Sequence, residues 1–126
     1  MKKLLFFTCL LILSNLSIAQ NTMDICLGIS KKMNIGLPRD VDTSTRLEAT
    51  SCIEDRGKIY FQFVHTVLTP SALPKDIKKL AKDGSKKQFC PNIEFKESLK
   101  FFSYDFYYVT IQKQPIFSFT ISKNDC

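Results

Sequence analysis

Four cysteines constrain this chain more than any other feature of its sequence. They lie after an apolar leader, at Cys26, Cys52, Cys90 and Cys126. An even number of cysteines in a small exported domain is typical of disulfides. A zinc site is the alternative, but there is no Cys-x-x-Cys pair, and the single histidine, His65, is far from every cysteine in the sequence. We therefore expect two disulfides and no metal.

The two disulfides have three possible connectivities, of which we favour Cys26–Cys52 with Cys90–Cys126. In the chain-entropy model, each closed loop adds roughly 3–4 kcal/mol to the free energy of unfolding. That is a large share of the stability of a small domain. We expect Cys90–Cys126 to fix the fold, because it ties the start of the last helical region to the end of the last strand.

The segment Met1 to Ala19 has the features of a cleavable secretory signal peptide. It begins with a positive Lys2-Lys3 pair, continues with an almost unbroken apolar run from Leu4 to Leu13, and ends on the small residues of Ser17-Ile18-Ala19. A membrane anchor is the alternative, but the apolar run is shorter than the roughly 20 residues needed to span a bilayer. We expect cleavage before Gln20.

A lipid anchor is a separate question, because Cys9 lies inside the leader. Lipoprotein signals have small residues before the acylated cysteine, whereas Phe6, Phe7 and Thr8 stand there in this chain. Cys9 also has apolar sequence on both sides. We therefore expect a periplasmic protein without lipid, with release from the cell as the alternative.

Removal of the leader leaves a single domain from residue 20 to residue 126, which is 107 residues long. This domain has 16 basic and 12 acidic residues, hence a net charge of +4. The excess is mild and spread along the chain. It fits contact with anionic envelope surfaces or acidic partners rather than nucleic acid, or it serves solubility alone. No later segment is long and apolar enough to span a membrane.

Hydrophobic periodicity and turn residues predict an α+β domain in which two hairpins alternate with helices. The predicted helices are Met23 to Asn34, Lys75 to Asp83 with a stop at Gly84, and a short one within Asn92 to Leu99. The predicted strands are Thr45 to Ile53, Ile59 to Thr69, Phe101 to Gln112 and Ile116 to Ser122. We expect an antiparallel four-stranded sheet with two to three helices packed on one face.

Alternation along the strands and spacing along the helices also predict which residues face the core. These are Leu47, Ala49, Ser51 and Ile53 on the first strand, Phe117, Phe119 and Ile121 on the last, and Ile77, Leu80 and Ala81 on the second helix. On the third strand, Tyr104, Phe106 and Tyr108 share one face and Phe101, Tyr107 and Val109 the other. Which of these two sets joins the core depends on a register that stays open.

Catalytic residues are not expected, because the chain has one histidine and no motif around it. His65 shares a strand face with Phe61 and Phe63, so we interpret it as part of the core or its edge. Glu94 and Glu97 could form a pair of carboxylates for sugar hydrolysis, but the solvated face of a helix is the simpler explanation. The sequence thus predicts no enzyme, no cofactor and no metal.

Two clusters could contact a protein partner. The lysines around the second predicted helix form the densest cluster of charged residues in the sequence. The predicted strand from Phe101 to Gln112 is strongly aromatic. Exposed aromatic surface often marks an interaction site. The alternatives are the water-facing side of an amphipathic helix and an ordinary core with a solvent face. The candidate partner-binding residues are Tyr104, Tyr107, Tyr108, Lys75, Lys78, Lys79 and Lys82.

Several short motifs resemble small exported proteins of Gram-negative bacteria. They are Leu37-Pro38, Val41-Asp42, Thr45-Arg46-Leu47, Ile59-Tyr60-Phe61, Cys90, Tyr104 and Cys126. A cysteine that opens a helix and a terminal hairpin that ends on a final cysteine also resemble the α/β pilotins of type II secretion. Pilotins bind a helical tail of the outer-membrane secretin, and the resemblance covers Leu37 to Cys126.

The resemblance implies an antiparallel sheet with helices on one side, a Cys90–Cys126 disulfide and a binding role. The chain departs from pilotins in lacking a lipidation signal, and the pair Cys26 and Cys52 is an addition to the pattern. We expect a periplasmic, non-enzymatic binding or adaptor protein that recognises a protein in the cell envelope. The alternatives are an immunity or inhibitor protein against an envelope-targeting toxin or hydrolase, and a small hydrolase built on His65 and a carboxylate.

Overall fold

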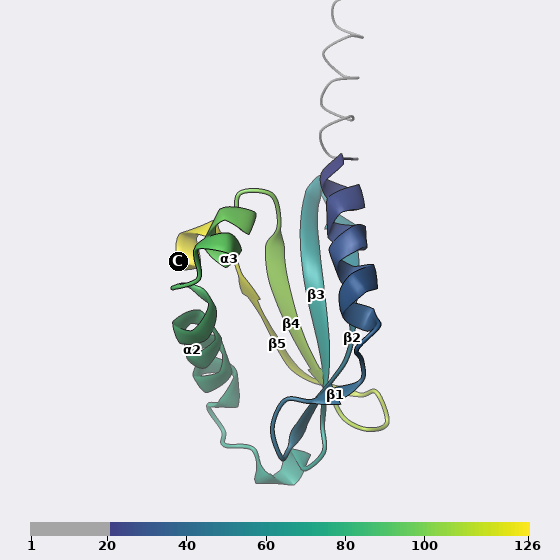
Figure 1. Cartoon of the computed structure of the whole chain (residues 1–126). Helices are drawn as coiled ribbons and strands as arrows, with labels where there is room; N and C mark the ends of the chain where they lie inside the picture. Colours follow the sequence, from purple (N-terminus) through teal and green to yellow (C-terminus); the bar gives the residue numbers. More distant parts are fainter. Residues whose placement is uncertain (1–20) are drawn as a thin grey trace, which may run out of the picture.

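The computed structural model describes residues 21–126, so the predicted signal peptide lies outside the described residues. A five-stranded sheet in the order β1-β2-β3-β4-β5 forms the centre of the molecule (Figure 1). The strands are β1 (Arg39–Asp40), β2 (Thr45–Asp55), β3 (Lys58–Val67), β4 (Ser103–Val109) and β5 (Pro115–Ile121). The helices are an N-terminal helix of residues 21–34, α2 (Ile77–Phe89), α3 (Ile93–Ser98) and the short 3₁₀ turns η1 (Pro70–Ala72) and η2 (Lys123–Asp125).

The α+β class is confirmed, but the prediction of a fully antiparallel sheet with four strands is wrong at two places. β2 pairs with β3 and β4 with β5 in antiparallel hairpins, whereas β3 and β4 run parallel. The reason is the connection through α2 and α3, which returns the chain to the end of the sheet where β3 began, so β4 must run in the same direction. The additional strand, β1, is a two-residue edge that pairs with β2 through Arg39 and Asp40.

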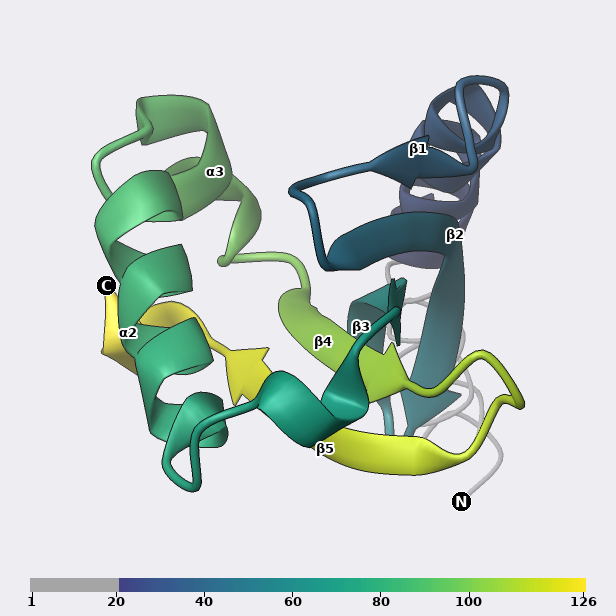
Figure 2. The ribbon, with the colours of Figure 1, turned by 90° about the horizontal axis from the view of Figure 1, so that it is seen from below.

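The three α-helices of residues 21–126 all lie on one face of the sheet, as predicted. The N-terminal helix covers β2 and β3, and α2 and α3 lie on the other side of the same face, beside β4 and β5 (Figure 2). The shared face follows from ring contacts across the sheet. The ring centroid of Phe63 lies 5.1 Å from those of Phe61 and Phe106, and the centroid of Phe106 lies 6.0 Å from that of Phe89 in α2. The opposite face of the sheet has no helix over it in the described part of the chain.

A β-bulge reverses the predicted orientation of half of β2. The register shifts between Leu47 and Ala49, and two residues there occupy the space of one. Leu47 faces the helices as predicted, but beyond the bulge it is Thr50 and Cys52 that do so. Ala49, Ser51 and Ile53, which were predicted to face the core, therefore point to the other side, and Ile53 is 39% exposed.

Asn34 and Ser30 of the N-terminal helix hold β2 just beyond this bulge. The Asn34 side chain accepts a hydrogen bond from the Thr50 backbone nitrogen at 2.8 Å and donates one to its carbonyl oxygen at 3.0 Å. The Ser30 and Thr50 hydroxyls lie 2.8 Å apart in a buried contact. These bonds give the polar groups of Thr50 partners away from water, as buried polar groups require.

The second helix is longer than predicted. We expected an end at Gly84, but α2 continues to Phe89. One glycine within a helix costs only about 1 kcal/mol, and the Lys86-Lys87 pair favours helix and complements the helix dipole in the last turn. The short helix predicted next is confirmed as α3, where the Asn92 side chain caps the start by accepting from the Phe95 nitrogen.

Both expected disulfides are present, which confirms the favoured connectivity and removes the zinc alternative. Cys26–Cys52 joins the N-terminal helix to β2, with Cα atoms 6.1 Å apart. Cys90–Cys126 joins the end of α2 to the last residue, with Cα atoms 5.3 Å apart. The first disulfide thus links the N-terminal helix to the sheet, and the second links α2 to the segment that follows β5.

Candidate functional site

A cleft of about 340 Å³ lies between α2 and the loop that joins β1 to β2. Its walls are aliphatic: Ile77 and Leu80 come from α2, and Val41 comes from the loop. Leu80 is 50% exposed and Val41 is 58% exposed. The floor is formed by His65 of β3 and Tyr108 of β4. The cleft therefore combines exposed aliphatic edges with an aromatic base.

The parallel pairing of β3 with β4 creates this floor. It aligns His65 with Tyr108, and their rings stack with centroids 4.6 Å apart. Tyr108 stacks in turn on Phe117 of β5 at 4.3 Å. Cross-strand aromatic pairs of this kind stabilise a sheet and give it a rigid surface. Three neighbouring strands thus contribute one ring each.

The floor of the cleft is uncharged at neutral pH. Burial of His65, which is 7% exposed, lowers its pKa to about 4, and its Nδ1 atom has no hydrogen-bond partner among the described residues. Burial and the negative charge of Asp42 raise the pKa of Tyr108 to about 12. Both rings are therefore neutral, and they present an apolar surface.

Asp42 is the one residue with a fixed charge among those that line the cleft. The backbone nitrogen of Ser44 donates a hydrogen bond to Asp42 Oδ1 at 2.8 Å, which lowers the pKa of the carboxyl group. The Ser44 hydroxyl donates a second bond at 3.0 Å. A single carboxylate at the edge of an apolar cleft can orient a partner that brings a donor or a positive charge.

The two glutamates considered for catalysis lie on α3, away from His65. Both are exposed, and Glu97 accepts a hydrogen bond from Lys100 at 2.6 Å. The surroundings of His65 are aromatic: Phe63, Phe106 and Tyr108 all lie within ring-contact distance. Among the described residues, His65 is thus packed as the predicted core histidine.

The structure separates the three tyrosines predicted to bind a partner. Tyr104 and Tyr108 lie on the helix-covered face together with Phe117 and Ile121, which settles the register that the sequence left open. Tyr104 packs against α3: its hydroxyl lies 2.6 Å from the Ser98 hydroxyl, and its ring stacks on Phe95 at 4.4 Å. Tyr107 points to the opposite face. Only Tyr108 lines the cleft.

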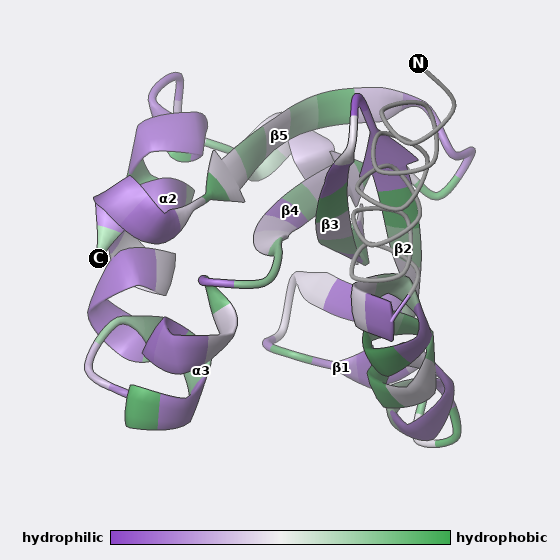
Figure 3. Ribbon diagram, turned by 90° about the horizontal axis from the view of Figure 1, so that it is seen from above, coloured by the Kyte–Doolittle hydropathy of each residue, from purple (hydrophilic) through white to green (hydrophobic). Residues whose placement is uncertain are grey.

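The predicted lysines lie outside the cleft. Most residues of α2 are hydrophilic (Figure 3), and Lys78 and Lys79 are exposed. Lys82 pairs with Asp125 of η2 at 3.3 Å and so joins α2 to the end of the chain. Lys75 precedes α2. These side chains form a charged outer border, and the cleft lies on the other side of the helix.

Sequence reasoning missed the two aliphatic edges of the cleft. Leu80 was expected to face the core, yet it lines the open cleft and stays half exposed. The row Ile77, Leu80, Gly84 and Gln88 along α2, which all line the cleft, could have indicated it. Val41 gave no signal, because it lies in a loop whose position depends on the pairing of β1.

Within residues 21–126, no helix has both the length and the apolar composition that crossing a membrane requires. No protein-family model and no curated protein matches the sequence. The fold, however, is shared with three solved structures of low sequence identity.

The first of these three is a Pseudomonas aeruginosa protein described as secreted, with a TM-score of 0.74 and 11% identity over 86% of this chain and 96% of that chain. The second is EpsS, the pilotin of the Vibrio vulnificus type 2 secretion system, with a TM-score of 0.68 and 13% identity over 87% of this chain and 96% of EpsS. The third is AspS, the type II secretion pilotin of Vibrio cholerae, with a TM-score of 0.63 and 13% identity over the same shares. The resemblance to a pilotin-like fold is thereby confirmed.

Proposed function

We propose that this chain is a periplasmic, non-enzymatic adaptor that binds a protein of the cell envelope in the cleft between α2 and the β1–β2 loop. One observation carries the proposal: Leu80 and Val41 stand half exposed on the two sides of a cleft whose floor is the His65–Tyr108 ring stack. Exposed aliphatic edges over a preformed apolar floor are typical of protein-binding grooves. The two disulfides and the predicted leader support the periplasm as its location.

An amphipathic helix is the occupant that suits this cleft. Such a helix places apolar side chains at i, i+3, i+4 and i+7 into a groove, and it needs no backbone hydrogen bonds from the groove. The pilotin-like fold supports a secretin tail as the source of this helix. Because the predicted leader lacks a lipoprotein signal, the proposal covers binding of the partner and not its delivery to the outer membrane.

A fluorescent peptide with the sequence of the secretin C-terminal tail of the same bacterium tests the proposal directly. We expect the protein to bind this peptide and Leu80→Glu to weaken binding at least tenfold, because a carboxylate would lose water on entering the apolar interface. Fluorescence anisotropy measures the dissociation constant, and circular dichroism checks the fold of each variant.

Ile93→Glu is the matched control. Ile93 is 78% exposed at the start of α3, outside the cleft, and the substitution adds the same charge. It should leave the dissociation constant unchanged. If the wild-type protein fails to bind the tail, the secretin-binding role is wrong. If both variants weaken binding equally, the cleft is not the site.

A further inference from the structure

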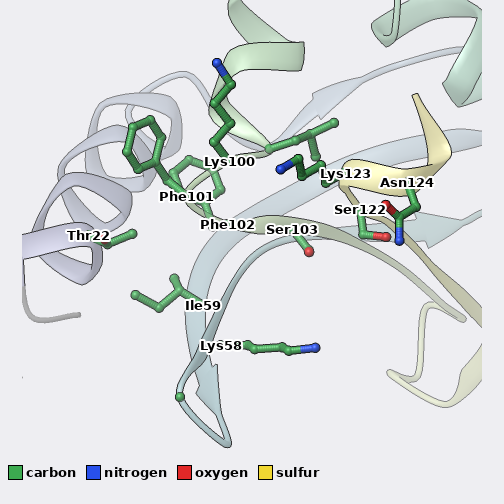
Figure 4. Close-up of a pocket in the computed structure, with 12 residues that line it drawn as sticks. Thr22, Lys58, Ile59, Lys100, Phe101, Phe102, Ser103, Ser122, Lys123 and Asn124 are labelled. Atoms are coloured by element: carbon green, nitrogen blue, oxygen red, sulfur yellow. The ribbon is translucent and has the colours of Figure 1, made fainter. Parts of the chain in front are cut away.

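A second hollow, of about 600 Å³, lies at the opposite end of the sheet from the cleft (Figure 4). The parallel strands β3 and β4 begin here with Lys58 and Ser103, and antiparallel β5 ends here just before Ser122. The cleft, by contrast, lies over the other ends of these strands, next to Tyr108 and Phe117. The two sites are therefore separate.

The charge around this hollow has one sign. Three lysines line it, Lys58, Lys100 and Lys123, and no acidic side chain does so. Glu97 holds the Lys100 ammonium at 2.6 Å. Lys58 and Lys123 form no ion pair within the described part of the chain. Two unneutralised ammonium groups thus border one cavity.

The acidic residues that adjoin Lys123 in the sequence and Lys58 in the strand register interact with other side chains. Asp125 follows Lys123 by two residues, but its Oδ1 faces Lys82 at 3.3 Å and its Oδ2 accepts from the Ser122 nitrogen at 2.8 Å. Asp55 lies opposite Lys58 in the β2–β3 register, and its side chain is directed to Arg56 at 3.9 Å. The positive charge of the hollow is therefore available to a ligand.

Neutral donors and an apolar wall complete the hollow. In Figure 4 the side chains of Lys58 and Lys123 lie on either side of Ser103, while Lys100 extends away from them. The Ser103 hydroxyl and the Asn124 amide can donate hydrogen bonds. Phe101, which is 64% exposed, forms part of the apolar lining.

We propose that this hollow binds the phosphate monoester group of an anionic ligand between Lys58 and Lys123. A phosphate monoester carries a charge of about −1.5 to −2 at neutral pH, which matches two free ammonium groups. Ammonium groups bind phosphate as point charges, and the Ser103 hydroxyl adds a neutral hydrogen bond to a phosphate oxygen. The exposed Phe101 suits a ligand with an apolar part beside the phosphate.

Two kinds of probe separate a lipid from a soluble source of this phosphate. Glycerol 3-phosphate and inorganic phosphate represent soluble ligands and are titrated by calorimetry in a phosphate-free buffer. Vesicles of phosphatidylcholine with phosphatidic acid represent a lipid monoester, and pure phosphatidylcholine vesicles show the background in flotation. Binding in either arm supports the site and identifies the source, whereas no binding in both arms overturns it.

The double variant Lys58→Gln/Lys123→Gln should weaken binding by roughly an order of magnitude or more. Both side chains are exposed, so the fold should persist, which circular dichroism checks. The matched control is Lys78→Gln/Lys79→Gln, which removes the same charge from the outer face of α2 and should have little effect. Equal weakening by the two double variants would mean general charge attraction and would overturn the proposal.

An NMR titration of the wild-type protein gives a measurement that needs no variant. The largest amide shift changes on adding the bound probe should fall at Lys58, Ser103 and Lys123. Changes centred on α2 instead would place the phosphate on the helix lysines and would contradict the assignment.

Discussion

His65 is a neutral ring held in an apolar place, and that position makes the fold sensitive to acid. Its Nδ1 atom lacks a hydrogen-bond partner among the described residues, and the backbone groups of Tyr107 and Phe63 and the charge of Asp42 offset only part of the cost of burying a protonated ring. The ring also stacks on Tyr108, with centroids 4.6 Å apart. The histidine therefore contributes to the cleft as a flat aromatic surface.

Stability should fall between pH 7 and pH 5 because of His65. Burial lowers its pKa in the folded state to about 4, while the unfolded chain keeps the ordinary value of 6.5. The unfolded state thus takes up the proton first, and the stability present above pH 6.5 is lost as the pH falls toward 4. The expected loss from pH 7 to pH 5 is about 2 kcal/mol.

Urea unfolding at the two pH values measures this loss, and His65→Phe is the control. Phenylalanine keeps a ring over Tyr108 and removes the titrating group, so the variant should lose much less stability over the same interval. An equal loss in both proteins would assign the acid sensitivity to the carboxylates and contradict the role of His65.

Individual elements were predicted better than the way they pair. The helices and the two hairpins follow from local periodicity, and the helix-covered face of β3 was predicted correctly from Phe61 and Phe63. The alternation of apolar and polar residues in the sequence does not reveal the bulge beyond Leu47. Because of this bulge, Thr50 and not Ala49 lies on the helix-covered face. The parallel pairing of β3 and β4 depends on where α2 and α3 pack, which local sequence does not encode.

The two faces of β4 should respond in opposite ways to a buried charge. Tyr108→Glu places a carboxylate between the rings of His65 and Phe117, 4.6 and 4.3 Å from the present ring, and should lower the free energy of unfolding by about 3–5 kcal/mol. Tyr107→Glu, on the face without helices, should cost about 1 kcal/mol or less.

Urea unfolding monitored by circular dichroism compares these two variants. The cleft proposal adds a second expectation: Tyr107→Glu should fold and still bind the secretin peptide, because Tyr107 does not line the cleft. If Tyr107→Glu folds but fails to bind, the helix-free face of the sheet is the interface, and the proposed site is wrong.

At the scale of the whole molecule, two helical groups cover the two sides of one face of the sheet, and each is held by its own disulfide. The candidate cleft exists only through this assembly, because α2, a loop and two central strands supply its residues. The cysteines predicted the two disulfides from the sequence, but they could not place Leu80 across the cleft from Val41. That arrangement depends on the curvature of the sheet and on the position of α2, which arise from packing between segments distant in sequence.

The two disulfides should protect different parts of the molecule. The N-terminal helix buries Cys26 and Ser30 and packs Met23 and Met33 against the core, while its outward residues Ile25, Leu27 and Ile29 are 53%, 48% and 40% exposed. Cys26–Cys52 adds a covalent link to these contacts. The Cys90–Cys126 bond instead fixes the end of α2, which forms one wall of the cleft.

We expect Cys26→Ala/Cys52→Ala and Cys90→Ala/Cys126→Ala each to lower the free energy of unfolding by roughly 3–4 kcal/mol. Hydrogen exchange should then distinguish them. The first variant should lose protection mainly in residues 21–34. It should keep peptide binding, because Cys52 pairs with the first half of β3 whereas the cleft lies over the last residues of β3 and β4. The second should lose protection in α2 and weaken peptide binding, because Leu80 is no longer held over the floor. An identical exchange pattern in the two variants would mean that the helices detach as one cooperative unit, and the division of the molecule into two separately anchored sides would be wrong.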